Sequence, residues 1–116
     1  MRYLFVLHDA PYGTERVYNG LRWAREMLQG PGSEARMFFF ADAVAAAKSG
    51  QHTPNGYYNV GKMVAGVAAA GAEVGCCGSC LDARGIGDEE LVKGTHRSSM
   101  SELAEWTAWA DQVINI

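Results

Sequence analysis

The residues best suited to chemistry lie in the stretch 71–87, which reads GAEVGCCGSCLDARGIG. It contains all three cysteines of the 116-residue chain, within a span of five residues. An apolar segment of β type, Ala72–Cys77, leads into a Gly-Ser turn, and Cys80 follows in the expected first turn of a helix. Unpaired backbone N–H groups and the positive end of the helix dipole favour a thiolate there. This position predicts a reactive thiol at Cys80.

Arg84 and Gly85 strengthen that prediction. If the residues after Cys80 are helical, Arg84 lies four positions on and shares its face, so a fixed cation adds to the stabilisation of a sulfur anion. Gly85, like the glycines before Cys80, leaves room for close backbone approach. The alternative is that Cys80 is a small buried hydrophobic residue. The turn, the arginine and the glycines together favour the reactive thiol.

The three cysteines allow four interpretations. Cys77-Gly-Ser-Cys80 has the CxxC spacing of a dithiol redox site, and Cys76-Cys77 is a vicinal pair that would form only a strained disulfide. A structural zinc site is disfavoured because there is no second CxxC and the histidines are scattered, at positions 8, 52 and 96. The fourth interpretation is a single reactive cysteine, Cys80, that carries a group. Strand alternation places Cys76 and Cys77 on opposite faces, so one of them serves packing.

Length and composition predict one domain of ordinary size with a sizeable core. A net charge of −3, a pI near 5.5 and ten dispersed basic residues argue against a nucleic-acid partner. Apolar runs are too short to span a membrane, and the chain begins with a strand-like segment in place of a signal peptide. We therefore expect a cytoplasmic protein, in which clustered cysteines indicate thiol chemistry rather than a disulfide framework.

Apolar strand-like segments alternate with amphipathic or capped helical ones along the whole chain. Strands are expected at 1–7, 36–41, 72–77, 95–98 and 112–116. Helices are expected from a Thr14 N-cap to about Gln29, from an Asp42 cap to Gly50, over 60–70, from 81, over 88–93, and after a Ser99–Glu102 capping box. This order predicts an α/β sandwich with a mostly parallel sheet. The carboxyl ends of its strands bring Cys80, the loop 8–13 and Asp42 to one edge, where such sheets bind ligands.

Three segments together carry a family resemblance. The segment 77–85, CGSCLDARG, with the upstream loop PNGYYN at 54–59 and the segment 11–16, PYGTER, resembles the DsrE/DsrF-like family and is most similar to its YchN-like branch. The resemblance covers essentially the whole chain, and Cys80-x-x-x-Arg84-Gly85 is its most specific part. It implies a three-layer α/β/α domain with a parallel sheet of about five strands, assembled as a homotrimer or homohexamer.

The same resemblance implies a sulfur relay. Cys80 would hold sulfane sulfur as a persulfide, and Arg84 and Gly85 would complete its motif. Single-domain members need separate sulfur donor and acceptor proteins, which no residue of this chain identifies. We expect a sulfur carrier or sulfurtransferase-like protein that needs no bound cofactor or metal. Two alternatives remain: an oligomeric small-molecule-binding module without catalysis, and a Cys77–Cys80 thiol-disulfide switch.

Several residues outside the motif could line the site. His8, at a strand end, is either a proton relay for the thiol or a histidine with an ordinary hydrogen bond. Tyr57 and Tyr58 line the cysteine pocket or a subunit interface, or pack in the core, and Asn59 either joins them or caps the next helix. Asp82 is expected to be solvated, and a Glu15–Arg16 pair is expected across the first helix turn or an interface.

The chain is also expected to be a homo-oligomer. Hydrophobic residues make up 48% of the sequence, with three Trp, five Tyr and four Phe, which is more than a small core readily hides. The polar loop 51–59 is long for a compact domain and carries two adjacent tyrosines, so we expect it to lie near the interface.

Overall fold

The computed structural model describes all residues, 1–116, and is built around one five-stranded sheet. Every strand pair is parallel, and the strand order is β4-β3-β2-β1-β5. The strands are β1 (Arg2–Leu7), β2 (Glu34–Phe39), β3 (Glu73–Cys77), β4 (Thr95–Ser98) and β5 (Gln112–Asn115). Five successive residues of β1 are buried, as expected for a parallel strand covered on both faces. The predicted parallel α/β fold is confirmed.

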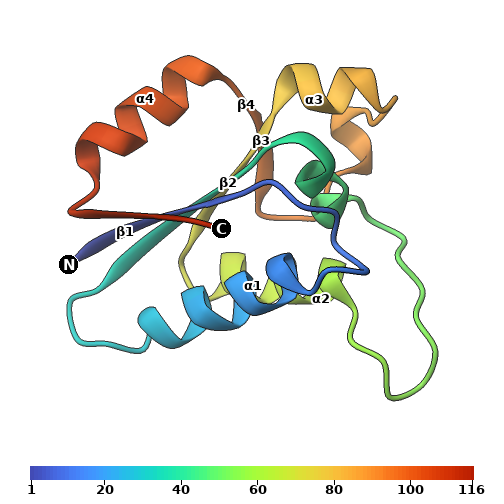
Figure 1. Ribbon diagram of the computed structural model, residues 1–116, viewed down its shortest axis with the longest axis horizontal. Helices are drawn as coiled ribbons and strands as arrows, with labels where there is room; N and C mark the ends of the chain where they lie inside the picture. Colours follow the sequence, from blue (N-terminus) through green and yellow to red (C-terminus); the bar gives the residue numbers. More distant parts are fainter.

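Helices cover both faces of the sheet, which makes three layers (Figure 1). Helices α1 and α2 lie together on one face, and α4 lies on the other. There the ring of Trp106 of α4 meets the ring of Phe38 of β2 edge to face, with centroids 6.4 Å apart. The short helix α3 stands where β3 ends. The α-helices are α1 (Arg16–Met27), α2 (Val60–Ala69), α3 (Gly78–Ala83) and α4 (Met100–Trp109); the 3₁₀ helices are η1 (Ala41–Ala47) and η2 (Asp88–Glu90). No helix is long and apolar enough to cross a membrane.

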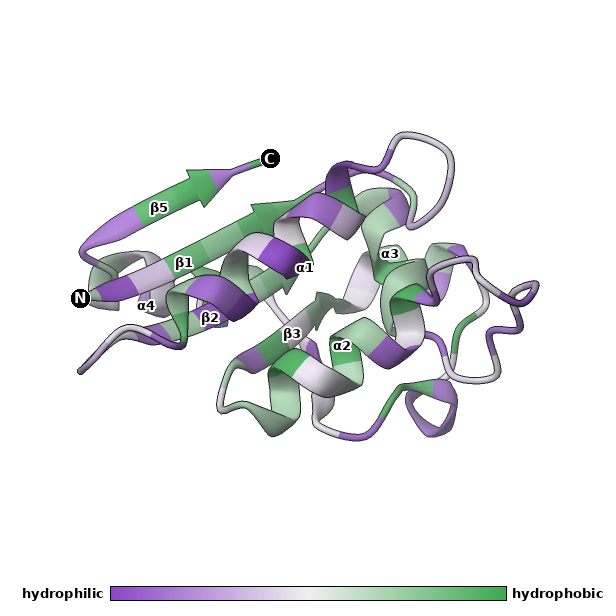
Figure 2. Cartoon of the chain, turned by 90° about the horizontal axis from the view of Figure 1, so that it is seen from below, coloured by the Kyte–Doolittle hydropathy of each residue, from purple (hydrophilic) through white to green (hydrophobic).

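The core is a single cluster of 26 buried residues, with no buried polar side chain. Figure 2 shows that apolar residues concentrate along the inner strands, whereas the outward surface of α1 and the loop before α2 are largely hydrophilic. The largest fully buried side chains are Phe5, Phe38 and Phe39. Because these rings lie on β1 and β2, the two central strands are fixed by packing on both faces. The ends of those strands are therefore a rigid base for the cysteine segment.

The first helix begins later than predicted, at Arg16 rather than after a Thr14 N-cap, and it ends at Met27 rather than Gln29. Glu15 occupies the cap position in a left-handed conformation with φ of 65°, and no side chain caps the helix. The Thr14 hydroxyl accepts only a long bond of 3.4 Å from the Arg16 N–H. Arg16 pairs with Asp9 at 3.3 Å, so the expected Glu15–Arg16 pair across the first helix turn is wrong, and a pair at an interface stays a prediction.

The second strand and the following helix also differ from the prediction. The strand covers 34–39 rather than 36–41, because Ala41 takes a left-handed φ of 49° and starts η1. Asp42 does not cap this helix, because its carboxylate binds Arg84 instead. The segment to Ala47 is a 3₁₀ helix rather than an α-helix reaching Gly50. The altered turn matters because it places the Ala41 N–H against the cysteine segment.

Two more element ends depart from expectation. The helix expected over 88–93 is only the turn Asp88–Glu90, because Leu91 instead forms an antiparallel bridge with Lys48. At α4 the Ser99 hydroxyl accepts from the Glu102 N–H at 3.1 Å, so the predicted N-cap is confirmed. The reciprocal half of the capping box is wrong, because the Glu102 carboxylate binds Ser98 and His96 of β4 instead.

Candidate functional site

Strand β3 and helix α3 place the three cysteines in three different environments. Cys76 is fully buried, and burial followed by the neighbouring Cys77 thiol raises its pKa to about 12. Cys77, the next residue, has 9% of its surface exposed and precedes the first residue of α3. Cys80, in the first turn of α3, is the most accessible of the three. Cys76 is therefore the packing cysteine, and the chemistry is left to Cys77 and Cys80.

The Cys80 sulfur lies against the turn that follows β2. The Ala41 N–H donates to Cys80 Sγ at 3.2 Å, which is a short contact for a sulfur acceptor. Ala41 is aimed this way by its left-handed backbone, a conformation that a non-glycine residue rarely adopts. Such strain often accompanies functional sites. A hydrogen bond from a backbone N–H to sulfur stabilises a thiolate or a persulfide anion more than a neutral thiol.

Cys77 and Cys80 titrate as a pair. Burial and the hydrogen bond with the Cys77 thiol raise the pKa of Cys80 more than the Ala41 N–H and the Arg84 charge lower it. Burial also raises the pKa of Cys77, but hydrogen bonds with Ser79 and Cys80 outweigh burial and lower it overall; the Cys77 and Ser79 side chains are 3.3 Å apart. The lower pKa of the pair therefore belongs to Cys77 rather than to Cys80, where the stabilised thiolate was expected.

Arg84 does not hold the sulfur directly. Its guanidinium donates to Asp42 Oδ1 from Nε at 3.1 Å and from Nη2 at 2.8 Å, and Nη1 donates to the Cys80 carbonyl oxygen at 3.1 Å. Asp42 lies in η1, so Arg84 ties the end of α3 to the turn that carries the Ala41 N–H. Its positive charge still lowers the pKa of Cys80, as the smallest of the effects named above. Arg84 is thus a positioning residue as well as a remote cation.

Gly85 ends α3 with a backbone conformation that residues other than glycine rarely adopt. Its φ is 66°, in the left-handed region that favours glycine. Its N–H donates to the Asp82 carbonyl at 3.1 Å, and the next N–H, of Ile86, reaches back to Leu81 at 3.0 Å. This turn buries Ile86 and sets the position of Arg84. Arg84 and Gly85 of the motif therefore form the end of α3, and the turn at Gly85 sets the position of the Arg84 guanidinium.

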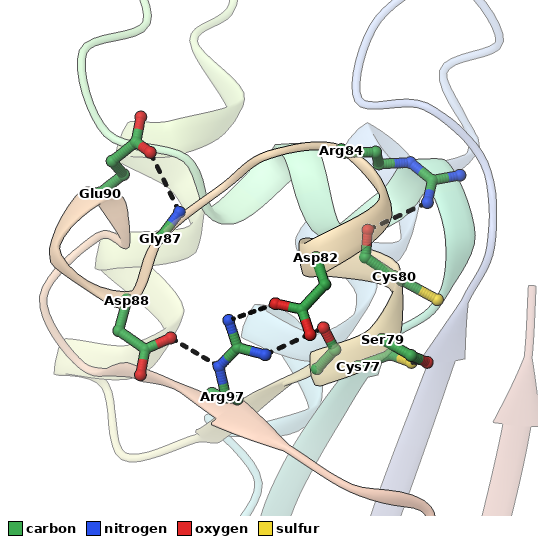
Figure 3. A network of polar contacts seen from close by, with 10 residues as sticks. Cys77, Ser79, Cys80, Asp82, Arg84, Gly87, Asp88, Glu90 and Arg97 are labelled. Carbon is green, nitrogen blue, oxygen red and sulfur yellow. Dashed lines mark hydrogen bonds and ion pairs between the residues drawn. The ribbon is translucent and has the colours of Figure 1, made fainter.

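Arg97 of β4 is the residue that inspection of the sequence missed (Figure 3). Its guanidinium donates to Asp88 at 2.6 Å, pairs with Asp82 at 3.0 Å and donates to the Gly78 carbonyl at 3.0 Å. The Asp82 side chain is 71% exposed, so the expected solvated acid is confirmed, and it also pairs with Arg97. Arg97 therefore contacts α3 at two points, Gly78 and Asp82. It links this helix to the edge strand β4 and, through Asp88, to η2. Two aspartates that follow the cysteine turn, Asp82 and Asp88, are the only sequence sign of such a partner.

His8 lies at the same edge of the sheet but makes no contact with sulfur. Its ring stacks on Phe40 with centroids 5.6 Å apart, and its Nε2 is 2.7 Å from Asn115 Oδ1 at the end of β5. Phe40 immediately precedes Ala41, so His8 supports the turn that binds Cys80. The ordinary hydrogen bond is therefore the observed one, and a direct proton relay from His8 is not formed.

Tyr57, Tyr58 and Asn59 belong to a separate region. Tyr58 stacks between Tyr57 and Tyr18, at 4.6 and 4.2 Å, in the loop that projects from the body in Figure 1. The tyrosines border a surface hollow formed by residues 53–59 with Lys62 and Met63, which contains no cysteine. Asn59 caps α2 by accepting from the Lys62 N–H at 3.0 Å. No contact joins these three residues to the cysteines, so the structure does not bring them into the site.

Similar proteins place this geometry in a family. The DsrE/DsrF-like family matches residues 1–116. The chain is 36% identical to protein YchN of Escherichia coli over 96% of this chain and 95% of that one. It is 37% identical to the uncharacterised protein MK0008 of Methanopyrus kandleri over 94% and 88%, respectively.

Solved structures of similar fold support the same family assignment. The crystal structure of ychN protein from E. coli superimposes with a TM-score of 0.90 at 34% identity, over 99% of this chain and 98% of that one. A protein of unknown function from Methanobacterium thermoautotrophicum, MTH1491, shares the fold with a TM-score of 0.79 at 14% identity, over the same fractions. With its full length matched by the family and its fold matched by YchN, this chain belongs to the DsrE/DsrF-like family.

Proposed function

We propose that this protein is a sulfane-sulfur carrier that holds sulfur as a persulfide on Cys80. The observation that carries the proposal is the Ala41 N–H donated to Cys80 Sγ at 3.2 Å, on the most accessible thiol of the chain. Family membership supports the same chemistry. The role is that of a carrier: sulfur enters from one protein and leaves to another.

Loading is a thiol exchange that needs no oxidant. The Cys80 sulfur attacks the outer sulfur of a donor persulfide, a Cys80 S–S bond forms, and the donor's own S–S bond breaks to release the donor thiolate. The Cys80 proton passes to Cys77, the thiol of the pair with the lower pKa, in its thiolate form. Unloading repeats the exchange, with an acceptor thiolate attacking the terminal sulfur and Cys80 leaving as thiolate.

A dithiol switch is the second candidate, because the thiols of Cys77 and Cys80 interact directly. If Cys77 attacks the inner sulfur of the Cys80 persulfide, a Cys77–Cys80 disulfide forms and hydrosulfide leaves. The carrier and the switch therefore differ in whether Cys77 is required for sulfur transfer. A carrier needs one nucleophile, and a switch needs two.

A transfer assay distinguishes the carrier from the dithiol switch. Protein loaded with a low-molecular-weight persulfide and freed of donor is treated with cyanide, which removes the terminal sulfur as thiocyanate. We expect about one thiocyanate per chain from the wild type and from Cys77→Ser, and none from Cys80→Ser, because one nucleophile carries the sulfur. A wild type that yields a Cys77–Cys80 disulfide and no thiocyanate, beside a Cys77→Ser variant that still yields about one thiocyanate per chain, would contradict the carrier and support the switch.

We also propose that the chain works as a homo-oligomer, a trimer or a hexamer, and meets separate donor and acceptor proteins. Exposed large apolar side chains support an association surface: Met1, Trp23, Tyr57, Met100 and Val113. Among these, Tyr57 lies on the projecting loop, where it belongs to a stacked group of tyrosines. Aromatic residues on a projecting loop are typical of protein interfaces.

A further inference from the structure

The distribution of lysine in this chain is uneven. The sequence has seven arginines spread over its length but only three lysines, Lys48, Lys62 and Lys93. All three line the same surface pocket, which has a volume of about 330 Å³. They come from three separate segments, namely the end of η1, the first turn of α2 and the stretch before β4. No arginine, aspartate or glutamate lines this pocket.

The walls of the pocket are held by an internal hydrogen-bond network. Gln51 donates to the carbonyls of Lys48 and Ala46 at 2.8 and 3.0 Å, and its Oε1 accepts from the Gly61 N–H at 3.0 Å. This single side chain joins the end of η1 to the start of α2. On the other side, Val92 N–H donates to the Ala47 carbonyl at 2.7 Å. The segments that carry the three lysines are therefore fixed relative to one another before any ligand arrives.

The charge of the pocket is largely uncompensated. Lys48 pairs with Glu90 at 3.3 Å, whereas Lys62 and Lys93 have no acidic partner. Lys62 lies in the first turn of α2, a turn without any acidic residue, where the helix dipole disfavours a cation. A residue that opposes local preference without a structural partner is a sign of function. The pocket thus keeps two unpaired positive charges in a chain whose net charge is −3.

The apolar residues of the pocket, together with its lysines, indicate the class of ligand. Ala65, Leu91 and Val92 supply apolar surface beside the ammonium groups. A lysine ammonium is a point charge that commonly binds phosphate, and three of them line this pocket. The volume lies in the range of small-molecule sites. We propose that this pocket binds a small phosphate monoester, with the phosphate among the three lysines and a short apolar body on Ala65, Leu91 and Val92.

This site is separate from the cysteine site. Cys80 contacts the first residue of η1, and Lys48 follows the last, so the seven residues of η1 separate them by about 14 Å. No cysteine lines the pocket. Ligand binding therefore needs no sulfur chemistry, and the Cys80→Ser variant should bind as the wild type does.

The proposal is tested by an NMR titration of ¹⁵N-labelled protein with phenyl phosphate. We expect saturable shifts confined to the amides of residues 48–51, 61–65 and 91–93. Lys62→Gln and Lys93→Gln should each weaken binding about fivefold to tenfold, because each removes one charge-assisted hydrogen bond. Inorganic phosphate should bind more weakly than phenyl phosphate, and phenol should cause no saturable shift.

The matched control is Arg22→Gln, which removes one exposed positive charge on α1 outside the pocket. It should leave the affinity unchanged. Equal weakening by Arg22→Gln would show general charge attraction and would overturn the proposal. Shifts that map elsewhere, equal binding of phenol, or no saturation up to about 10 mM, which is a binding free energy of only about 3 kcal/mol, would also overturn it.

Discussion

At the scale of residues, the site is a coupled pair of thiols rather than one activated cysteine. Cys80 is more accessible, but the lower pKa belongs to Cys77. The pattern CGSC predicts the spacing of these thiols but not which of them holds the proton. That depends on the Ala41 N–H and on Ser79, and the Ala41 contact arises only when two distant segments meet.

Removal of the Cys77 thiol should make Cys80 more acidic. The Cys77 sulfur raises the pKa of Cys80 through a hydrogen bond and through charge. In Cys77→Ala only burial still raises this pKa, while the Ala41 N–H and the Arg84 charge lower it. The pH profile of iodoacetamide alkylation at Cys80 should therefore move to lower pH in this variant. Peptide mapping of the wild type should show Cys80 modified first and Cys76 last. An unchanged or higher midpoint in Cys77→Ala would contradict the coupled pair.

At the scale of elements, the sequence predicts a parallel α/β sheet well, but it does not predict the strand order, and it predicts helix ends poorly. Strands 1–7 and 72–77 are recognisable because both faces are buried and the residues are apolar. Asp42 and Thr14 look like caps, yet tertiary partners decide their roles: Asp42 binds Arg84, and the helix after Thr14 starts through a left-handed Glu15. Local propensity cannot foresee a partner more than 40 positions away in the sequence.

Arg97 should set the position of α3. We expect Arg97→Met to shift the alkylation midpoint of Cys80 and to slow persulfide loading severalfold, because α3 loses its contacts to Gly78 and Asp82. Arg97→Lys should restore little, since an ammonium cannot reproduce the three-way fork. Arg16→Met, which removes an exposed pair with Asp9, is the control. A wild-type pH profile in Arg97→Met, with normal loading, would contradict this role.

At the scale of the whole molecule, the three-layer fold buries one hydrophobic core but leaves several large apolar side chains exposed. The 26 core residues form one cluster, while Trp23, Tyr57 and Met100 stay about half or more exposed. Composition predicts such an excess, and the fold shows where it lies. The tyrosine loop, expected beside the cysteine pocket or at a subunit interface, does not contact the cysteines, and its place at an interface stays a prediction.

Light scattering tests the proposed assembly. We expect a mass three or six times the 12.5 kDa of one chain at micromolar concentration. Tyr57→Asp should lower that mass, because a charge buried at an apolar interface is costly. Tyr57→Phe, which keeps the aromatic ring and adds no charge, should leave it unchanged. A monomer in the wild type would refute the assembly.

The central claim is that Cys80 alone carries sulfane sulfur, and peptide mass spectrometry after incubation with a persulfide donor tests it most directly. The account predicts an adduct of about 32 Da on Cys80 in the wild type and in Cys77→Ser, with none in Cys80→Ser, because persulfidation adds one sulfur to the attacking thiol. An adduct on Cys77 in the wild type, or a Cys77–Cys80 disulfide as the only product, would contradict it.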